Sequence, residues 1–353
     1  MALADPYGHL IGKSIGAGWT IESRIPRAPG STGGNFSICF RVRNAAGESA
    51  FCKVLDYHTA VTSPDPVAAL QQMTADFQHE VANLDVVRDG SMRRVVLALE
   101  AATESESSVP MSLLSFIIFE PADGDIRVVL PATFTGLELP MRFALLHHAV
   151  LGIRELHQAS IAHQDVKPSN LLVMTSDGGA SEGKVADLGR ASVLSRPSRF
   201  DAMRFPGDRS YAPPEILYDA IPTGFDLRRK GTDLYQLGSL TAFVLGGSSM
   251  QALVYDELDP SLRWDAWSGP YSDVEPALRD ATDRAIARVL AVVPDWARPH
   301  LKPLLAGLCD PNPQTRNAMN ARFLNVSNYE LGRVITLLDR LRSMAILRLV
   351  TAA

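Results

Sequence analysis

Cysteine is scarce in this sequence, with only Cys39, Cys52 and Cys309 among 353 residues. The three are far apart and form no CxxC pair, which predicts neither a disulfide framework nor a zinc site and favours a reducing compartment. Long apolar runs are also absent: no stretch reaches roughly 18 apolar residues, and segment 344–350 is interrupted by Arg348. The first residues lack the charged-then-apolar order of a signal peptide. We therefore expect a cytoplasmic protein that does not enter a membrane.

The sequence has no excess of positive charge and no internal repeat. Its formal net charge is −5, which argues against nucleic acid as the main partner. The hydrophobic fraction of 46% and the charged fraction of 21% are ordinary for a globular protein. The length suffices for one large core or for two lobes.

Short apolar runs bounded by turn residues predict strands in the first third of the chain. These runs cover residues 19–25, 36–42, 49–56, 94–100 and 113–120. Residues 63–87 differ, because their apolar side chains recur at helical spacing. Asp65 suits the cap of that helix and Pro66 its first position.

The rest of the chain is predicted to be mainly helical. Apolar periodicity predicts helices at 141–159, 230–246, 273–293 and 298–309. The Pro, Gly and Asp residues of 119–126 mark the break, so we expect a mostly-β part at 1–120 and a mostly-α part at 121–326. Ser327 and Glu330 form a candidate capping box for a terminal amphipathic helix at 327–353. That helix is expected to pack on the larger part, with a partner-binding role as the alternative.

The polar segment HQDVKPSN, residues 163–170, carries the strongest chemical signal. Pro168 forbids a regular helix here, so the segment is a loop between a helix and a strand-like run. Asp165 can orient a hydroxyl and accept its proton, and Lys167 can neutralise a transferring phosphoryl group. Asn170 can bind a hard cation. Taken alone, the segment could also be a polar turn.

Three further segments carry weaker signals. Asp187 precedes a Leu-Gly turn, where it could bind Mg²⁺ or simply start a β-turn. Lys53 in an apolar strand could pair with Glu80 on the predicted helix and face a phosphate, or both could be unrelated surface charges. The glycine-rich segment 29–40 could bring backbone amides close to phosphates or form a hairpin tip.

In this order, the segments resemble the eukaryotic-type serine/threonine protein kinase family. Later landmarks also agree over residues 15–325. Glu215 follows a proline as at the end of an activation segment. Residues 232–238 are similar to the buried helix whose aspartate, here Asp233, braces the catalytic loop in the family. Arg316 is similar to the late arginine that pairs with that glutamate. The resemblance implies an α+β, two-lobed fold with a small antiparallel sheet in the first lobe and a larger helical second lobe.

The resemblance also implies roles for individual residues. Asp165 would be the catalytic base, Lys167 would stabilise the γ-phosphate, and Glu80 would hold Lys53 on the α- and β-phosphates of ATP. Asn170 and Asp187 would bind Mg²⁺. The implied nucleotide-binding residues are Gly33, Gly34, Phe36, Ser37, Lys53, Glu120 and Ala122. The substrate would be a protein hydroxyl. Self-association through the C-terminal helix is a further candidate interaction.

The chain departs from the family pattern at several positions. Gln164 replaces the arginine that usually meets a phosphorylated activation segment, so we expect activity without that phosphorylation. Asp208 replaces a threonine beside the catalytic aspartate and could engage Lys167. Phe51 replaces a small residue above adenine and could narrow the pocket, and Ser37 replaces the last glycine of the phosphate loop.

Two other functions remain alternatives. A pseudokinase scaffold fits the unusual phosphate loop, although such a protein need not keep Lys53, Asp165 and Asp187. A small-molecule kinase can share the H-x-D-x-x-x-x-N spacing of residues 163–170. Such enzymes generally lack the pair that Glu215 and Arg316 are expected to form.

Overall fold

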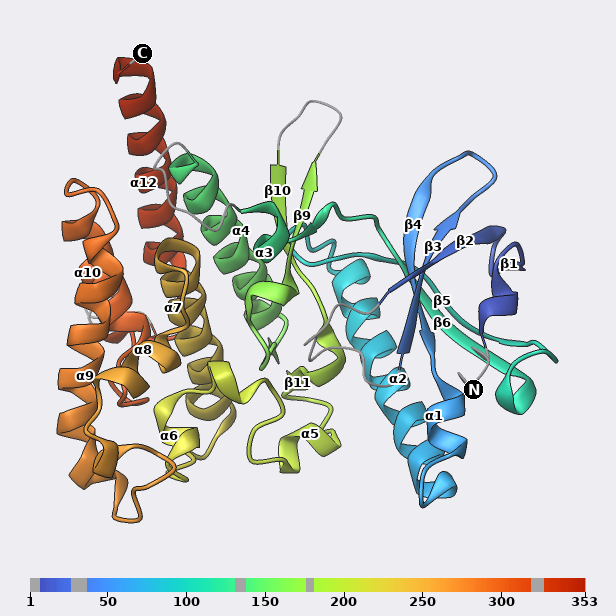
Figure 1. Ribbon diagram of the computed structural model, residues 1–353, viewed down its shortest axis with the longest axis horizontal. Helices are drawn as coiled ribbons and strands as arrows, with labels where there is room; N and C mark the ends of the chain where they lie inside the picture. The colour runs from blue at the N-terminus through green and yellow to red at the C-terminus, as the bar shows by residue number, and fades with distance from the viewer. Residues whose placement is uncertain (1–6, 27–36, 131–137, 176–180, 319–326, 353) are drawn as a thin grey trace. The chain divides into compact units, whose positions relative to one another are not determined.

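A computed structural model of the chain describes residues 7–26, 37–130, 138–175, 181–318 and 327–352. The chain divides into two compact units (Figure 1). One comprises residues 1–91 and 96–122, and the other comprises residues 92–95 and 123–353. The change from strands to helices falls within 119–126, the segment that the sequence marks as a break.

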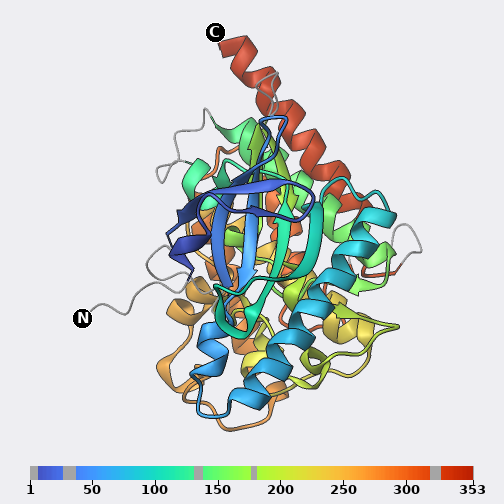
Figure 2. The ribbon, with the colours of Figure 1, turned by 90° about the vertical axis from the view of Figure 1, so that its right-hand side faces the viewer.

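The first unit is built on an antiparallel sheet of six strands in the order β1-β2-β3-β4-β6-β5 (Figure 2). The strands are β1 (Ser14–Ile15), β2 (Trp19–Ile25), β3 (Ser37–Arg43), β4 (Ser49–Leu55), β5 (Ala98–Ser105) and β6 (Leu113–Phe119). Alternation along β4 buries Ala50, Cys52 and Val54 in the core of the unit. Phe51 and Lys53 therefore lie on the opposite face of the sheet.

The predicted strand at 94–100 is wrong in its position, because β5 begins only at Ala98. Arg94 and Val95 bond instead within the second unit. The Arg94 amide donates to Glu155 Oε2 at 2.9 Å, and its carbonyl accepts from the Val185 amide at 2.8 Å. Val95 and Val96, two of the apolar residues that suggested a strand, are buried, and Val95 forms an isolated bridge with Val185.

The predicted helix at 63–87 is confirmed as α2 (Pro66–Asp89), which follows the short α1 (Tyr57–Val61). The Asp65 carboxylate caps α2 by accepting the Ala68 amide at 3.1 Å. Glu80 is 7% exposed and shares the buried stripe of the helix with apolar residues. An acid at such a position needs a partner, because an unpaired buried charge is costly.

The second unit is mainly helical, as the sequence predicts. Its helices are α3 (Ile126–Val129), α4 (Leu139–Gln158), α5 (Arg199–Ala202), α6 (Pro214–Leu217), α7 (Gly231–Gly246), α8 (Met250–Glu257), α9 (Tyr271–Ala291), α10 (Arg298–Leu308) and α12 (Gly332–Ala352). Its short strands are β7 (Gly124–Asp125), β8 (Ile161–Ala162), β9 (Leu171–Thr175), β10 (Ser181–Val185) and β11 (Ser192–Val193). They form two small sheets, β10-β9-β7 and β11-β8, which hold the polar loop of residues 163–170 between α4 and β9.

The terminal helix α12 packs along α4 (Figure 1). Its stripe of Val334, Leu338 and Leu341 is buried, which confirms the predicted packing. The candidate capping box is wrong, because the helix starts at Gly332 and Ser327 precedes it in a separate turn. Gly332 follows Leu331, which is buried and therefore anchors the start of the helix in the core.

In the described part of the chain, no single helix is long and apolar enough to cross a membrane. One pair bent by 85°, Asp226–Gly246 with Met250–Glu257, passes that test on length and composition only.

Candidate active site

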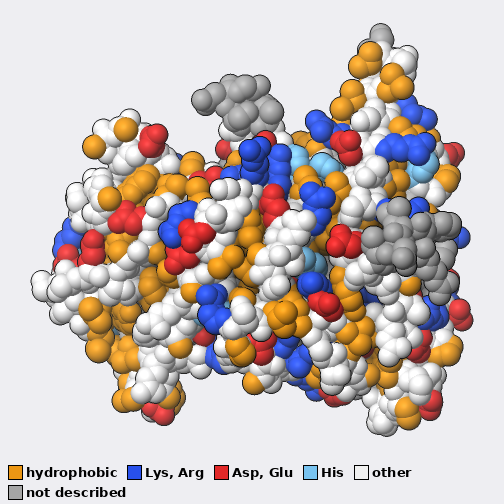
Figure 3. Space-filling model, turned by 180° about the vertical axis from the view of Figure 1, so that it is seen from behind, with side chains coloured by type: hydrophobic (Ala, Val, Ile, Leu, Met, Phe, Trp, Pro, Cys, Tyr) orange, Lys and Arg blue, Asp and Glu red, His pale blue; other side chains and the backbone are white. Residues whose placement is uncertain are grey.

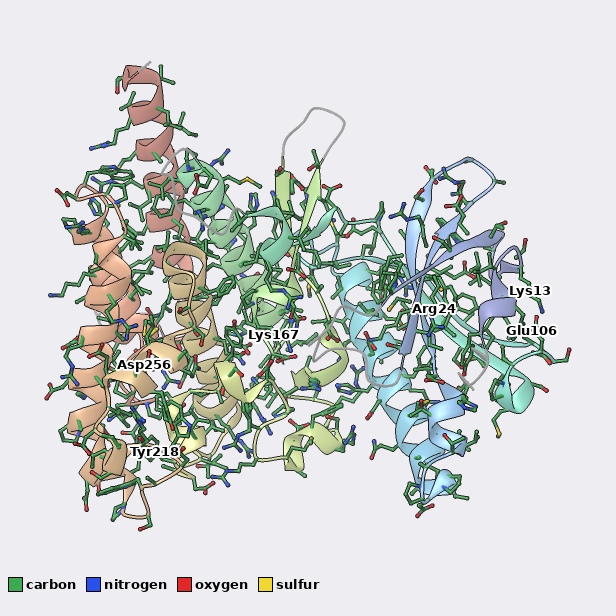
Figure 4. The ribbon with its side chains drawn as sticks, viewed as in Figure 1. Lys13, Arg24, Glu106, Lys167, Tyr218 and Asp256 are labelled. Carbon is green, nitrogen blue, oxygen red and sulfur yellow. The ribbon has the colours of Figure 1, made fainter. Side chains whose placement is uncertain are left out.

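The polar loop predicted from the sequence is a buried structure rather than an exposed turn. It leaves β8, and Pro168–Asn170 then form a single 3₁₀ turn before β9. Lys167, labelled in Figure 4, lies in this loop and is 4% exposed, and Asp165 is 2% exposed. Polar side chains buried to this extent need specific partners.

Asp165 is held by several partners within the second unit. Its Oδ2 lies 2.9 Å from Lys167 Nζ, and its Oδ1 accepts the Asp208 amide at 2.7 Å. The Asn170 side-chain amide donates to the Asp165 carbonyl at 2.9 Å. The aspartate, lysine and asparagine chosen by spacing are therefore brought together, and a segment from after residue 187 completes the arrangement.

Asp233, in the first turn of α7, braces the backbone of the loop. Its carboxylate accepts the His163 amide at 2.7 Å and the Gln164 amide at 2.8 Å. Its Oδ2 also lies 2.9 Å from His157 Nε2. The bracing role expected of Asp233 is confirmed, and it explains how Gln164 is kept at a φ of 68°, a backbone region that side chains other than glycine rarely adopt.

Asp187 follows β10 and lies beside the loop. It has a φ of 67°, and Leu188–Arg190 form the turn that the sequence predicts. The Ala186 amide donates to the Asn170 carbonyl at 2.9 Å, so the two predicted metal ligands come from paired segments.

The donors present suit Mg²⁺ in combination with a nucleotide. Asn170 offers one amide oxygen and Asp187 one carboxylate, and Mg²⁺ in such sites takes one or two protein carboxylates together with phosphates and water. Within the described ranges, no group of three or more His, Cys, Asp or Glu side chains could hold a metal ion alone. These residues therefore fit a metal that arrives with ATP.

Lys53 and Glu80 pair within the first unit, as the sequence suggests. Lys53 Nζ donates to both carboxylate oxygens of Glu80, at 2.9 and 2.8 Å. The side chains of Lys53 and Glu80 are 22% and 9% exposed, so the pair is largely shielded from water. Asp76 and Asp85 on the same helix contact Gln72 and Arg88 instead.

The other predicted nucleotide-binding residues are only partly described. Gly33, Gly34 and Phe36 lie outside the described residues, and Ser37 is the buried first residue of β3. Glu120 accepts the Leu97 amide through its side chain and donates its own amide to the Leu97 carbonyl. Ala122 is exposed.

Phe51 packs against an aromatic neighbour on the same sheet. Its ring centroid lies 6.3 Å from that of Phe119, with the planes tilted by 45°. Phe51 pairs with Phe119 across β4 and β6, and it lies on the Lys53 face of β4. The Phe51 ring, which the sequence analysis expects to narrow the nucleotide pocket, is therefore held against the sheet.

Asp208 engages Lys167, as the sequence suggested, but not exclusively. Its Oδ2 lies 3.6 Å from Lys167 Nζ, farther than the 2.9 Å from that nitrogen to Asp165 Oδ2. Its Oδ1 accepts the Ser210 amide at 3.0 Å and so caps the next turn. Lys167 therefore lies between two carboxylates.

Glu215 and Arg316 form the expected ion pair. Arg316 donates from both terminal nitrogens to the two carboxylate oxygens of Glu215, at 2.9 and 2.8 Å, and both side chains are at most 1% exposed. This bidentate geometry joins the end of the 187–215 segment to the turn that follows α10.

Two polar residues were missed by the sequence interpretation. The Gln236 side chain on α7 accepts the Val166 amide at 3.0 Å and donates to the Gln164 carbonyl at 3.2 Å. His157 at the end of α4 contacts the bracing Asp233. A signal was available, because each is a polar residue within a predicted apolar helix. A polar side chain in such a buried position needs a hydrogen-bond partner.

Comparisons with known proteins agree with this geometry. Residues 33–323 match the family model of the protein kinase domain. CBL-interacting protein kinase 20 of Oryza sativa subsp. japonica is 26% identical over 305 residues, covering 85% of this chain and 56% of that protein. Serine/threonine-protein kinase chk-1 of Caenorhabditis briggsae is 25% identical over 276 residues, covering 77% of this chain and 52% of that protein.

A further relative matches a shorter region. Serine/threonine-protein kinase DCLK1 of Rattus norvegicus is 26% identical over 203 residues, covering 53% of this chain and 43% of that protein. The aligned part is thus about half the length of each of these curated relatives.

Proposed function

This chain belongs to the protein kinase domain family, and from that premise we propose that it is a serine/threonine protein kinase. It would transfer the γ-phosphoryl group of ATP to a protein hydroxyl. The observation that carries the proposal is the arrangement of Asp165, whose carboxylate lies between Lys167 Nζ at 2.9 Å and the Asp208 amide at 2.7 Å. A carboxylate held in this way can orient a hydroxyl and accept its proton.

The same loop supplies the charge that phosphoryl transfer needs. Lys167 would stabilise the γ-phosphate, since its ammonium is buried and already positioned by Asp165. Mg²⁺, bound with ATP by Asn170 and Asp187, would neutralise phosphate charge. Lys53, fixed by Glu80, would contact the α- and β-phosphates. Backbone groups at Gly33, Gly34 and Glu120 would complete the nucleotide contacts.

The proposal includes activity without phosphorylation of the activation segment. Gln164 carries no charge, so it cannot form the ion pair with a phosphate that an arginine at this position makes in the family. It is 1% exposed and bonds to the Arg229 carbonyl at 2.8 Å. The segment therefore has no phosphate-binding cation at position 164.

A pseudokinase scaffold is the second candidate, because Phe51 and Phe119 pack together on the Lys53 face of the sheet. A small-molecule kinase is less well supported, since the ion pair of Glu215 and Arg316 ties down a segment that such enzymes generally lack.

We place the protein in the cytoplasm, with a protein substrate as its main partner.

Self-association through α12 is a further part of this proposal. The last turns of α12 expose Ile346, Leu347 and Val350, which are 44%, 61% and 71% exposed, and apolar side chains appear on the projecting helix in Figure 3. Sedimentation of the wild type and of a Leu347→Glu, Val350→Glu variant tests this point. A wild type that is monomeric at high concentration would rule it out.

The experiment that tests the proposed function measures nucleotide binding and phosphoryl transfer side by side. Thermal shifts with ATP and varied divalent metals report binding, and labelled γ-phosphate on an added protein or on the chain itself reports transfer. We expect both in the wild type, and binding without transfer in Asp165→Ala. Binding without transfer in the wild type supports the scaffold, and equal transfer by both chains overturns the site assignment.

Phosphoamino-acid analysis of the product separates the remaining alternative. Label on serine or threonine supports the protein kinase. Label found only on small-molecule acceptors would favour the small-molecule kinase.

A further inference from the structure

A basic turn next to the catalytic loop lies outside the proposed phosphoryl-transfer chemistry. Residues Asp226–Lys230 form a π-helical turn directly before α7 and contain Arg228, Arg229 and Lys230 in succession. Such turns are rare and occur often at functional sites. Arg229 is 5% exposed, so its charge requires specific acceptors.

Arg229 finds those acceptors on the activation segment. One terminal nitrogen donates to the Asp201 carbonyl at 2.7 Å and to the Phe200 carbonyl at 3.5 Å. The same nitrogen lies 3.6 Å from the Asp201 carboxylate. The short helix α5 is thus held at its carbonyl end by a cation, the favourable sign for a helix C-terminus.

Arg228 extends this contact along the segment. Its terminal nitrogen donates to the Met203 carbonyl at 2.7 Å and to the Arg204 carbonyl at 3.3 Å. Two neighbouring arginines therefore bind the main chain at positions 200, 201, 203 and 204. Backbone carbonyls are always present, so these contacts need no modified side chain.

Arg229 also contacts the catalytic loop. Its other terminal nitrogen donates to Gln164 Oε1 at 3.2 Å, while Gln164 Nε2 donates to the Arg229 carbonyl at 2.8 Å. A neutral amide at position 164 can accept from Arg229. An arginine at position 164 would instead place two buried guanidinium groups side by side.

The segment held by this turn ends on the catalytic aspartate. A Cβ at Gly207 would clash with the Gln164 carbonyl oxygen, so the backbone of the segment lies against the loop there. The next amide, of Asp208, donates to Asp165 Oδ1 at 2.7 Å. Displacement of residues 200–204 would therefore move a donor that orients Asp165.

We propose that Arg229, assisted by Arg228, is a positioning residue that locks the activation segment onto the catalytic loop through backbone carbonyls. This lock takes the place of a phosphate–arginine contact. It also explains the glutamine at position 164, whose neutral amide accepts a hydrogen bond from Arg229. The inference rests on the proposed kinase function for its effect on rate, but the lock itself can be measured without activity.

Hydrogen exchange and kinetics of the full chain test the lock together. In Arg229→Met, which keeps bulk but loses the donors, we expect faster exchange of amides 199–208 and a fall in kcat of about tenfold or more. The KM for ATP stays unchanged, because Arg229 does not belong to the proposed nucleotide contacts. Arg288→Gln, which changes a surface arginine on α9, serves as the control and leaves both readouts unchanged.

An exchange of the two residues guards against a variant that simply misfolds. Gln164→Arg alone creates two buried cations, and we expect it to lower kcat. The combined Gln164→Arg, Arg229→Gln variant restores one cation and one amide, and we expect it to recover most of the lost rate.

The outcomes separate the lock from the kinase function. Unchanged exchange of amides 199–208 in Arg229→Met, or a combined variant no better than Gln164→Arg, overturns the lock. A wild type with protected amides 199–208 and no phosphoryl transfer retains the lock and contradicts the kinase proposal.

Discussion

At the residue scale, Arg316 shows how strongly a single buried charge can matter. We expect Arg316→Met to lower the free energy of unfolding by about 3–5 kcal/mol, because it leaves Glu215 charged and buried without its partner. The carbonyls of Gly231 and Asp310 lose a donor as well. Chemical denaturation followed by circular dichroism measures the change.

A double variant provides the control. Glu215→Leu with Arg316→Met removes both charges, and we expect it to be more stable than Arg316→Met alone. A cost below about 1 kcal/mol for the single variant would contradict the assigned role of the pair.

His148 on α4 predicts a dependence of stability on pH. Burial, with Arg94, His147 and Arg342 nearby, lowers the pKa of His148 to about 3. Its Nδ1 accepts the Gly183 amide at 3.0 Å, which requires the neutral ring. Because the pKa in the folded state lies below that in the unfolded state, its contribution to stability is complete above about pH 6.5 and is lost as the pH falls towards 3.

The size of this loss can be isolated with a variant. Between pH 7 and pH 5 we expect the wild type to lose about 1–2 kcal/mol more than His148→Gln, whose side chain does not titrate. His9→Gln, at an exposed position, controls for removing a histidine. Parallel losses in the wild type and His148→Gln would show that His148 does not titrate differently on folding.

The residue pairs that the sequence predicted share one property. Lys53 with Glu80 and Glu215 with Arg316 were identified by their order along the chain, and both form bidentate contacts. Gln236 and Arg229 could not be predicted in this way. Most of their partners are backbone groups, which leave no pattern in the residue types.

At the element scale, the periodicity of apolar residues predicted that a helix exists more reliably than it predicted the first and last residues of an element. The stripe of α2 and the buried face of α12 were both predicted, because spacing of three and four residues has no other common cause. The strand at 94–100 was misplaced because an apolar residue such as Val95 fits a strand of the first sheet and a position beside Val185 equally well. The sequence pattern does not distinguish the two. The start of α12 was missed because a buried Leu331, rather than a polar cap, precedes it.

Two leucines on α12 test how that helix is held. Leu341 is fully buried, whereas Leu347 is 61% exposed on the same helix. We expect Leu341→Ala to cost about 2–5 kcal/mol through the lost packing and the cavity that remains. At a protein concentration at which the chain is monomeric, Leu347→Ala should change stability by less than about 0.5 kcal/mol, since helix propensity is nearly the same.

Urea denaturation of both variants measures these costs. A large cost at Leu347 that appears only at high protein concentration would support the proposed self-association, and a large cost in the monomer would contradict the exposure of Leu347. Equal, small costs would mean that α12 is not packed as described.

At the scale of the whole molecule, the division into a mostly-β and a mostly-α unit was predictable because the period of apolar residues changes from two to about 3.6. The arrangement of the candidate catalytic residues was less predictable. Asp165, Lys167 and Asn170 lie within one loop and could be predicted together, whereas the Asp208 amide reaches Asp165 only through the path of the activation segment. Residue spacing does not encode that path.

The central claim is that this chain catalyses phosphoryl transfer without a phosphorylated activation segment. The most direct test is the initial rate of γ-phosphate transfer by wild type treated with phosphatase and shown by mass spectrometry to carry no phosphate, beside Asp165→Asn. We predict that the treated and untreated wild type react at the same initial rate, and that Asp165→Asn is slower by roughly a hundredfold or more. A treated wild type that is inert and recovers on phosphorylation, or an Asp165→Asn variant as fast as the wild type, would contradict the claim.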